Sequence, residues 1–131
     1  MKKDITIPKI ENVHLAIVLE YNSIFKVNDW NVYLINERLE PLEMVLIVSK
    51  GFNTKDKTST MRHKLAVLPA KAFAKIEFMQ DEVLKLDNQF SVTFFIDNKM
   101  YEKTFLVKKN TVNPKTIKQI ELLNLKGIFL S

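Results

Sequence analysis

The stretch FSVTFFIDNKMYEKTFLV, residues 90–107, decides the fold class of this chain. Every second residue over 90–96 is apolar, and the same alternation runs over 101–107 with one interruption at Lys103. Alternation with a period of two is the pattern of a β-strand that buries one face. The Asp-Asn-Lys segment at 97–99 contains residue types that accept left-handed backbone in a tight turn. The stretch therefore predicts two antiparallel strands joined by a short turn.

The same alternation occurs five times before residue 90. These predicted strands run over about 13–19, 30–36, 44–48, 61–67 and 72–78. In the segment 44–48 apolar residues occupy both faces, so we expect both to be buried. Strands separated by turns, without intervening helices, predict an all-β fold. We expect a β-sandwich of about seven antiparallel strands, with a closed barrel as the alternative. The aromatic residues expected in its core are Trp30, Phe78, Phe90, Phe94 and Phe105.

A single domain is expected for the 131 residues, with a sandwich core over about 11–109 and an apolar tail over 110–131. Asn113 followed by Pro114 is a helix-start pattern and indicates one helical turn. From Ile117 onward, the apolar spacing agrees with either a helix or an extended chain. Large apolar side chains in this tail must be covered. We expect them to dock on their own domain or on a partner.

Composition excludes most catalytic and cofactor sites. The chain has no cysteine, two glycines and two histidines, His14 and His63, which excludes thiolate metal sites and glycine-rich cofactor loops. Residues 51–58 come near a phosphate-binding loop, but Asp56 occupies a position that needs glycine, and a strand follows where a helix is required. We therefore expect no cofactor, no metal ion, no catalytic residues and no enzymatic activity.

The formal net charge of +5 is concentrated in two segments. Residues 49–75 carry 7 basic and 1 acidic residue, and residues 99–131 carry 7 basic and 2 acidic residues. Nearly all of the cations are lysine, whereas proteins that grip phosphate favour arginine. Nucleic acid is therefore the less favoured partner. The lysines near Met1 precede no apolar signal segment, and no apolar run is long enough to span a membrane. We expect a cytoplasmic protein that does not bind a membrane.

Two groups of residues are candidate binding sites. Tyr33, Phe73 and Phe95 alternate with core positions and face away from the core. They are predicted to form an outer aromatic row for a protein partner or a homodimer, unless the tail or a loop covers it. Arg62, His63 and Lys64 end a run of hydroxyl residues that would hold an anion or a partner. The alternative is an outward Arg/Lys pair beside a partly buried histidine.

Two resemblances add to this interpretation. Val32-Tyr33-Leu34-Ile35-Asn36, Pro41 and the segment 45–51 resemble a strand, turn and strand of bacterial immunoglobulin-like sandwiches. Nearly the whole chain resembles a family of small Bacteroidota proteins. The residues that carry this resemblance are Val48-Ser49-Lys50-Gly51, the segment 58–63, Gln80-Asp81-Glu82, the segment 92–95 and Asn124-Leu125-Lys126-Gly127.

Members of that family are often named phenylalanine–tRNA ligase alpha subunit. A class II ligase core needs far more residues and several glycines, so the resemblance implies no such activity for this chain. The leading hypothesis is a non-enzymatic protein-interaction module whose partner is another protein or a second copy of itself. The alternative is a basic protein associated with nucleic acid or ribosomes.

Overall fold

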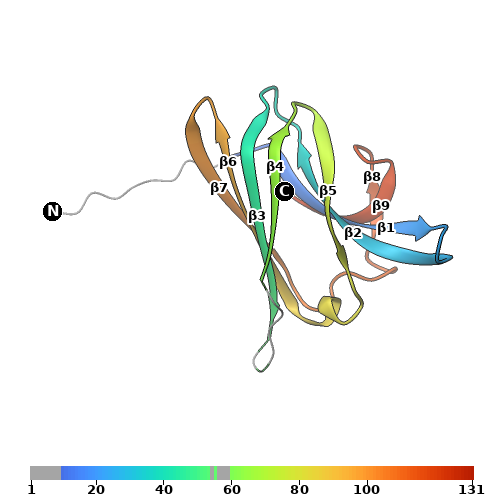
Figure 1. Cartoon of the computed structure of the whole chain (residues 1–131). Helices are drawn as coiled ribbons and strands as arrows, with labels where there is room; N and C mark the ends of the chain where they lie inside the picture. Colours follow the sequence, from blue (N-terminus) through green and yellow to red (C-terminus); the bar gives the residue numbers. More distant parts are fainter. Residues whose placement is uncertain (1–9, 54, 56–59) are drawn as a thin grey trace.

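The computed structural model describes residues 10–53, 55 and 60–131, which form two antiparallel β-sheets that face each other (Figure 1). The five-stranded sheet has the order β5 (Ala72–Met79), β2 (Val27–Asn36), β1 (Val13–Asn22), β9 (Leu125–Leu130) and β8 (Lys118–Ile120). The four-stranded sheet has the order β4 (Met61–Leu68), β3 (Leu42–Phe52), β6 (Asp87–Ile96) and β7 (Lys99–Val107). The single turn of 3₁₀ helix, η1 (Val83–Lys85), connects β5 to β6.

This architecture confirms the predicted all-β sandwich, with nine strands among the described residues in place of about seven. Each of the seven predicted segments forms a strand. The two additional strands come from the predicted tail, whose second half is extended and adds β8 and β9 to the five-stranded sheet. The helical turn expected at Asn113 is a single hydrogen-bonded turn, in which the Thr116 N–H donates to the Asn113 carbonyl over 3.1 Å.

The core lies between the two sheets and consists of the predicted inward rows. From the five-stranded sheet it contains Val13, Leu15, Ile17, Trp30, Val32 and Leu34, and from the four-stranded sheet Val45, Ile47, Phe90, Val92, Phe94, Ile96, Phe105 and Val107. β6 lies between β3 and β7, so its inward side chains are surrounded on all sides. Burial of these rows removes enough apolar surface from water to stabilise a domain of this size.

The prediction that Phe78 lies in this core is wrong because β5 contains a bulge. Val32 pairs with Glu77 and Tyr33 with Lys75, so Ile76 is an extra residue opposite β2. One extra residue reverses the facing of every residue that follows. Glu77 therefore points between the sheets, whereas Phe78 is half exposed.

The expectation that both faces of residues 44–48 are buried is also wrong. Val45 and Ile47 point into the core, but Met44 is exposed and Leu46 and Val48 are only half buried. Met44 has a positive φ of 51°, and the β3–β6 register shifts between Glu43 and Leu46. The outer face of the four-stranded sheet consequently lies open to solvent at this bulge.

The predicted tail docks on its own domain. Residues Leu15 to Val18 of β1 pair with Leu130 to Gly127 of β9. The β8–β9 hairpin brings Ile120, Leu123 and Leu125 over the outer face of the five-stranded sheet. There they form a second apolar cluster with Ala16, Val18, Tyr33 and Ile35. The chain thus covers part of its own outer surface.

Candidate functional site

The three residues of the predicted aromatic row do not lie together. Tyr33 and Phe73 are neighbours on the outer face of the five-stranded sheet, with ring centroids 5.9 Å apart in an edge-on arrangement. Phe95 lies on β6, in the opposite sheet. Tyr33 is buried, whereas Phe73 is half exposed. Alternation predicts which side of a strand a residue occupies but does not say which sheet contains the strand.

The hydroxyl group of Tyr33 already has a partner within the fold. It donates a hydrogen bond of 2.8 Å to Glu20 Oε1, which also accepts a 2.8 Å bond from the Asn31 amide. Lys75 Nζ lies 3.8 Å from the same oxygen. Burial, together with the bond to Glu20, raises the pKa of Tyr33 to about 12. These contacts hold Tyr33 in a polar network on the sheet surface.

Arg62, His63 and Lys64 lie on the outermost strand β4 but do not converge. Arg62 and Lys64 are exposed on the outer face, while His63 points toward the other sheet. Its Nε2 atom lies 2.8 Å from Glu77 Oε1. This is the arrangement of an outward cationic pair beside a partly buried histidine. Residues 54 and 56–58 of the segment that comes near a phosphate-binding loop, together with residue 59 and residues 1–9, lie outside the described residues.

Glu77 joins the two sheets through a polar cluster that the sequence did not predict. Ser49 Oγ donates a 2.8 Å hydrogen bond to Glu77 Oε1, the same oxygen that contacts His63. Ser49 therefore donates its hydrogen bond to the carboxylate. An activated serine nucleophile would instead donate it to the imidazole. The three residues of the cluster line a cavity of about 510 Å³, together with Met61 and Phe78. The cluster is arranged to bridge sheets and not to activate a nucleophile.

No group of three or more histidine or carboxylate side chains in the described parts of the chain is placed to hold a metal ion. The two histidines are separated, since His14 pairs with Glu37 and His63 pairs with Glu77. Among the same residues, no helix has the length and apolar content needed to cross a membrane.

His14 is buried on the outer face of the five-stranded sheet, where the C-terminal strand covers it. Its Nε2 atom lies 2.6 Å from Glu37 Oε1, and its ring contacts Phe129 with centroids 4.6 Å apart. The Nδ1 atom is buried without a hydrogen-bond partner. Burial lowers the pKa of His14 below its ordinary value of 6.5 despite the opposing effect of Glu37, and the charge of Lys103 also lowers it.

We expect the stability of the protein to fall on mild acidification because of His14. The folded state binds a proton at this site less well than the unfolded state, so stability is lost as the pH falls through 6.5. In His14→Gln, an amide replaces the titrating ring and can still donate to Glu37. Urea unfolding at pH 7.5 and pH 5.5 should give a smaller loss of unfolding free energy for this variant than for the wild type. Equal losses would show that His14 does not contribute.

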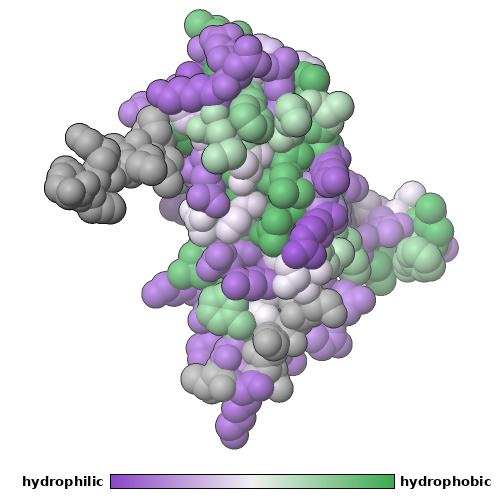
Figure 2. Space-filling model, turned by 60° about the vertical axis from the view of Figure 1, so that its left-hand side comes forward, coloured by the Kyte–Doolittle hydropathy of each residue, from purple (hydrophilic) through white to green (hydrophobic). Residues whose placement is uncertain are grey.

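Three strongly exposed apolar residues lie at the end of the β1–β2 hairpin, a region outside the sites predicted from the sequence. Leu39, in the connection between β2 and β3, is exposed to a similar extent. We call residues 21–27 the β1–β2 tip. Ile24 is 83% exposed, Phe25 74% and Tyr21 65%. Figure 1 shows β1 and β2 extending away from the facing sheets, and Figure 2 shows hydrophobic residues at the end of the projection on its right-hand side. Turns usually contain polar residues, so the Ile-Phe pair in the β1–β2 turn is the sequence feature that could have indicated an exposed apolar site.

Hydrogen bonds of Asn22 hold the tip in one conformation. Its side-chain Oδ1 accepts from the N–H groups of Ile24 and Phe25 over 3.0 and 3.2 Å. Its Nδ2 donates to Asp29 Oδ2 over 2.9 Å, and Lys26 completes the turn with a φ of 56°. The two apolar side chains are therefore presented on an ordered turn. An ordered turn loses less conformational entropy when a partner binds it.

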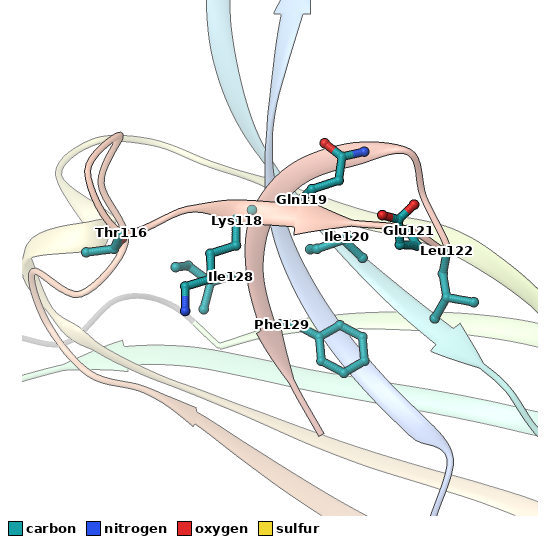
Figure 3. A pocket seen from close by; sticks show the side chains of 9 residues that line it. Thr116, Lys118, Gln119, Ile120, Glu121, Leu122, Ile128 and Phe129 are labelled. Atoms are coloured by element: carbon teal, nitrogen blue, oxygen red, sulfur yellow. The ribbon is translucent and has the colours of Figure 1, made fainter.

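A second apolar feature lies beside β8 and β9. This cavity of about 510 Å³, the C-terminal pocket, has apolar walls, and two of its lining residues are charged. The apolar residues Ile120, Leu122, Ile128 and Phe129 line it together with Lys118 and Glu121 (Figure 3). Leu122 and Phe129 are each nearly half exposed, so the pocket is open to solvent.

Comparison of the chain with protein-family models, curated proteins and solved structures found no match.

Proposed function

We propose that this protein is a non-enzymatic, immunoglobulin-like module that binds another protein through the β1–β2 tip. The observation that carries the proposal is the Ile24-Phe25 pair, exposed at the end of a projecting hairpin and held there by Asn22. Exposed apolar groups of this kind are costly in water and mark interaction sites. Aromatic residues are enriched at the centres of protein interfaces.

The strand order supports the immunoglobulin-like part of this proposal. When β1 to β7 are lettered A, B, C, C′, E, F and G, one sheet contains the order E-B-A and the other C′-C-F-G. Immunoglobulin domains place A, B and E in one sheet and C, F and G in the other. The β8–β9 hairpin extends the first sheet beyond strand A. In this lettering, the tip is the connection between strands A and B.

Charge favours a protein partner over a lipid or a nucleic acid. Near the tip, Lys26 lies in the turn and Lys75 lies 3.8 Å from Glu20, so two cations balance the half-buried carboxylates Glu20 and Asp29 of the adjoining strands. Anionic membrane surfaces recruit clusters of lysine and arginine around an inserted apolar group. Phosphate backbones likewise need several cations. An apolar tip without an excess of cations around it suits a partner with an apolar pocket.

The proposal is tested by removing the apolar groups of the tip. The double variant Ile24→Ser/Phe25→Ser changes exposed residues, so its stability should stay within about 0.5 kcal/mol of the wild type. The matched control is Met100→Ser/Leu106→Ser on β7, where both residues are also exposed. In affinity capture from cells that make the protein, we expect at least tenfold lower recovery of the captured proteins with the tip variant. The control should recover them as the wild type does.

Two outcomes would contradict this function. The first is equal recovery of the same proteins by the tip variant and the control, which would place binding elsewhere on the surface. The second is loss of all captured proteins after nuclease treatment, which would favour the alternative of a protein associated with nucleic acid or ribosomes.

A further inference from the structure

We propose that the partner of the β1–β2 tip is a second copy of this chain, whose C-terminal pocket receives Ile24 and Phe25. This inference rests on the proposed function, because it names the partner of the same tip. It assigns the C-terminal pocket as the receiving site. The tip and the pocket are then two halves of one contact.

The two surfaces match in chemistry. The tip presents a branched aliphatic side chain and a phenyl ring, and the pocket is walled by Ile120, Leu122 and Phe129. Its volume of about 510 Å³ lies within the range of pockets that bind drug-sized ligands. The half-exposed side chains of Leu122 and Phe129 provide apolar surface that an inserted ring would remove from water.

The charges beside these two surfaces are also complementary. The pocket includes one cation and one anion, Lys118 and Glu121. The tip has Lys26 in its turn and Asp29 on the adjoining strand. Opposite charges can therefore face each other at both sides of the contact, with Lys26 toward Glu121 and Asp29 toward Lys118. Complementary charges at the rim of an interface fix orientation and speed association.

The tip of a chain cannot reach its own pocket. The pocket contains Gly127, which pairs with Val18 on β1, whereas the turn begins four residues farther along, after Asn22. Four residues of strand span roughly 13 Å. β1 and β2 remain paired as far as Asn22 and Val27, so the hairpin does not fold back. The tip is therefore available to a different molecule.

Two-fold symmetry allows both contacts to form in one dimer. In a dimer with a two-fold axis, a contact from the tip of one copy to the pocket of the other is repeated in the reverse direction, so the proposed dimer contains the contact twice. An aromatic side chain buries on the order of 150–250 Å². Two tips and two pockets together approach about 1,000 Å², the lower limit for a specific interface. We therefore expect a dimer with a dissociation constant in the micromolar range.

The absence of cysteine makes a direct test of proximity straightforward. Phe25→Cys and Leu122→Cys are prepared as separate proteins, mixed in equal amounts and oxidised mildly. We expect disulfide-linked heterodimers on non-reducing gels, forming at least tenfold faster than in a mixture of Phe25→Cys with Met100→Cys. Met100 is exposed on β7, outside the proposed contact. Linkage at the same rate in both mixtures would overturn the inference.

Complementation provides an equilibrium test. By sedimentation velocity, the wild type should dimerise at micromolar concentration, whereas Phe25→Ser and Leu122→Ser should each stay monomeric at tenfold higher concentration. A mixture of the two variants retains one intact tip and one intact pocket, so it should regain heterodimers. The unfolding midpoint of each variant shows whether it is folded. Failure of the folded variants to complement would overturn the reciprocal contact.

The same measurements separate this inference from the proposed function. A wild type that is monomeric at high micromolar concentration would overturn self-association. If the Ile24→Ser/Phe25→Ser variant still lost its captured proteins, the tip would bind a different protein and the proposed function would stand. If that variant captured the same proteins as the control, both proposals would fail.

Discussion

Replacement of Phe94 by alanine is expected to lower the free energy of unfolding by about 3–5 kcal/mol. Phe94 is fully buried on the central strand β6, and its ring stacks on Tyr101 with centroids 6.0 Å apart. The substitution removes apolar area from the core and leaves a cavity that rigid neighbouring strands cannot close. Because a domain is stabilised by only about 5–15 kcal/mol, this single change removes a large part of the total.

Phe95→Ala is the matched control for this experiment. Phe95 follows Phe94 on the same strand but points to the outer face, where it is half buried. Its removal should cost no more than about 1.5 kcal/mol in urea unfolding at pH 7.5. A loss below about 1 kcal/mol for Phe94→Ala, or a loss no greater than that of Phe95→Ala, would contradict the assigned core.

Substitution of Gly127 by alanine is expected to destabilise the protein by about 3 kcal/mol, at the upper end of the range for overpacked sites. A Cβ atom at this position would lie 2.3 Å from the Ile17 carbonyl oxygen and 2.8 Å from Val18 Cα. Both are backbone atoms, so a side-chain rotation cannot relieve the clash. The β8–β9 hairpin must move away from β1, which uncovers the cluster that contains Tyr33 and Ile35.

The detachment should be visible locally as well as globally. Amide hydrogen exchange of β9 should become much faster in Gly127→Ala, while the exchange of β6 follows global stability. Lys126→Ala serves as the control, because Lys126 is the exposed neighbour on the same strand, and it should change stability by less than about 0.5 kcal/mol. If Gly127→Ala were as stable as this control, β9 would not approach β1 as closely as described.

Sequence alternation predicted the strands well where pairing is regular. The rows of β6 and β7 face the core as expected, because one buried face requires an apolar residue at every second position. It failed where pairing is irregular. The bulge at Ile76 turns Phe78 outward and Glu77 inward. Nothing in the local sequence requires that extra residue, which arises from the way β5 pairs with β2.

The candidate sites were harder to predict from the sequence than the strands, because they depend on how distant segments pack together. His63 was correctly considered as a partly buried histidine, but its partner Glu77 reaches it only because of the bulge in β5. Tyr33 and Phe95 share a pattern but lie in different sheets. The tip could have been selected from the sequence, since Ile24 and Phe25 interrupt a turn where polar residues are usual.

The strand order also explains why the positive charge of the chain is uneven. The outermost strands of the two sheets are β5, β8, β4 and β7, and each contains a cation, respectively Lys75, Lys118, Arg62 and Lys99. Of the interior strands, β1, β2 and β6 contain no lysine or arginine, whereas β3 contains Lys50 and β9 contains Lys126. Exposed strand edges are templates for runaway aggregation, and lysine on an edge repels an incoming strand. The cations on the outermost strands therefore oppose the addition of a further strand at the sheet edges, and this role requires no phosphate ligand.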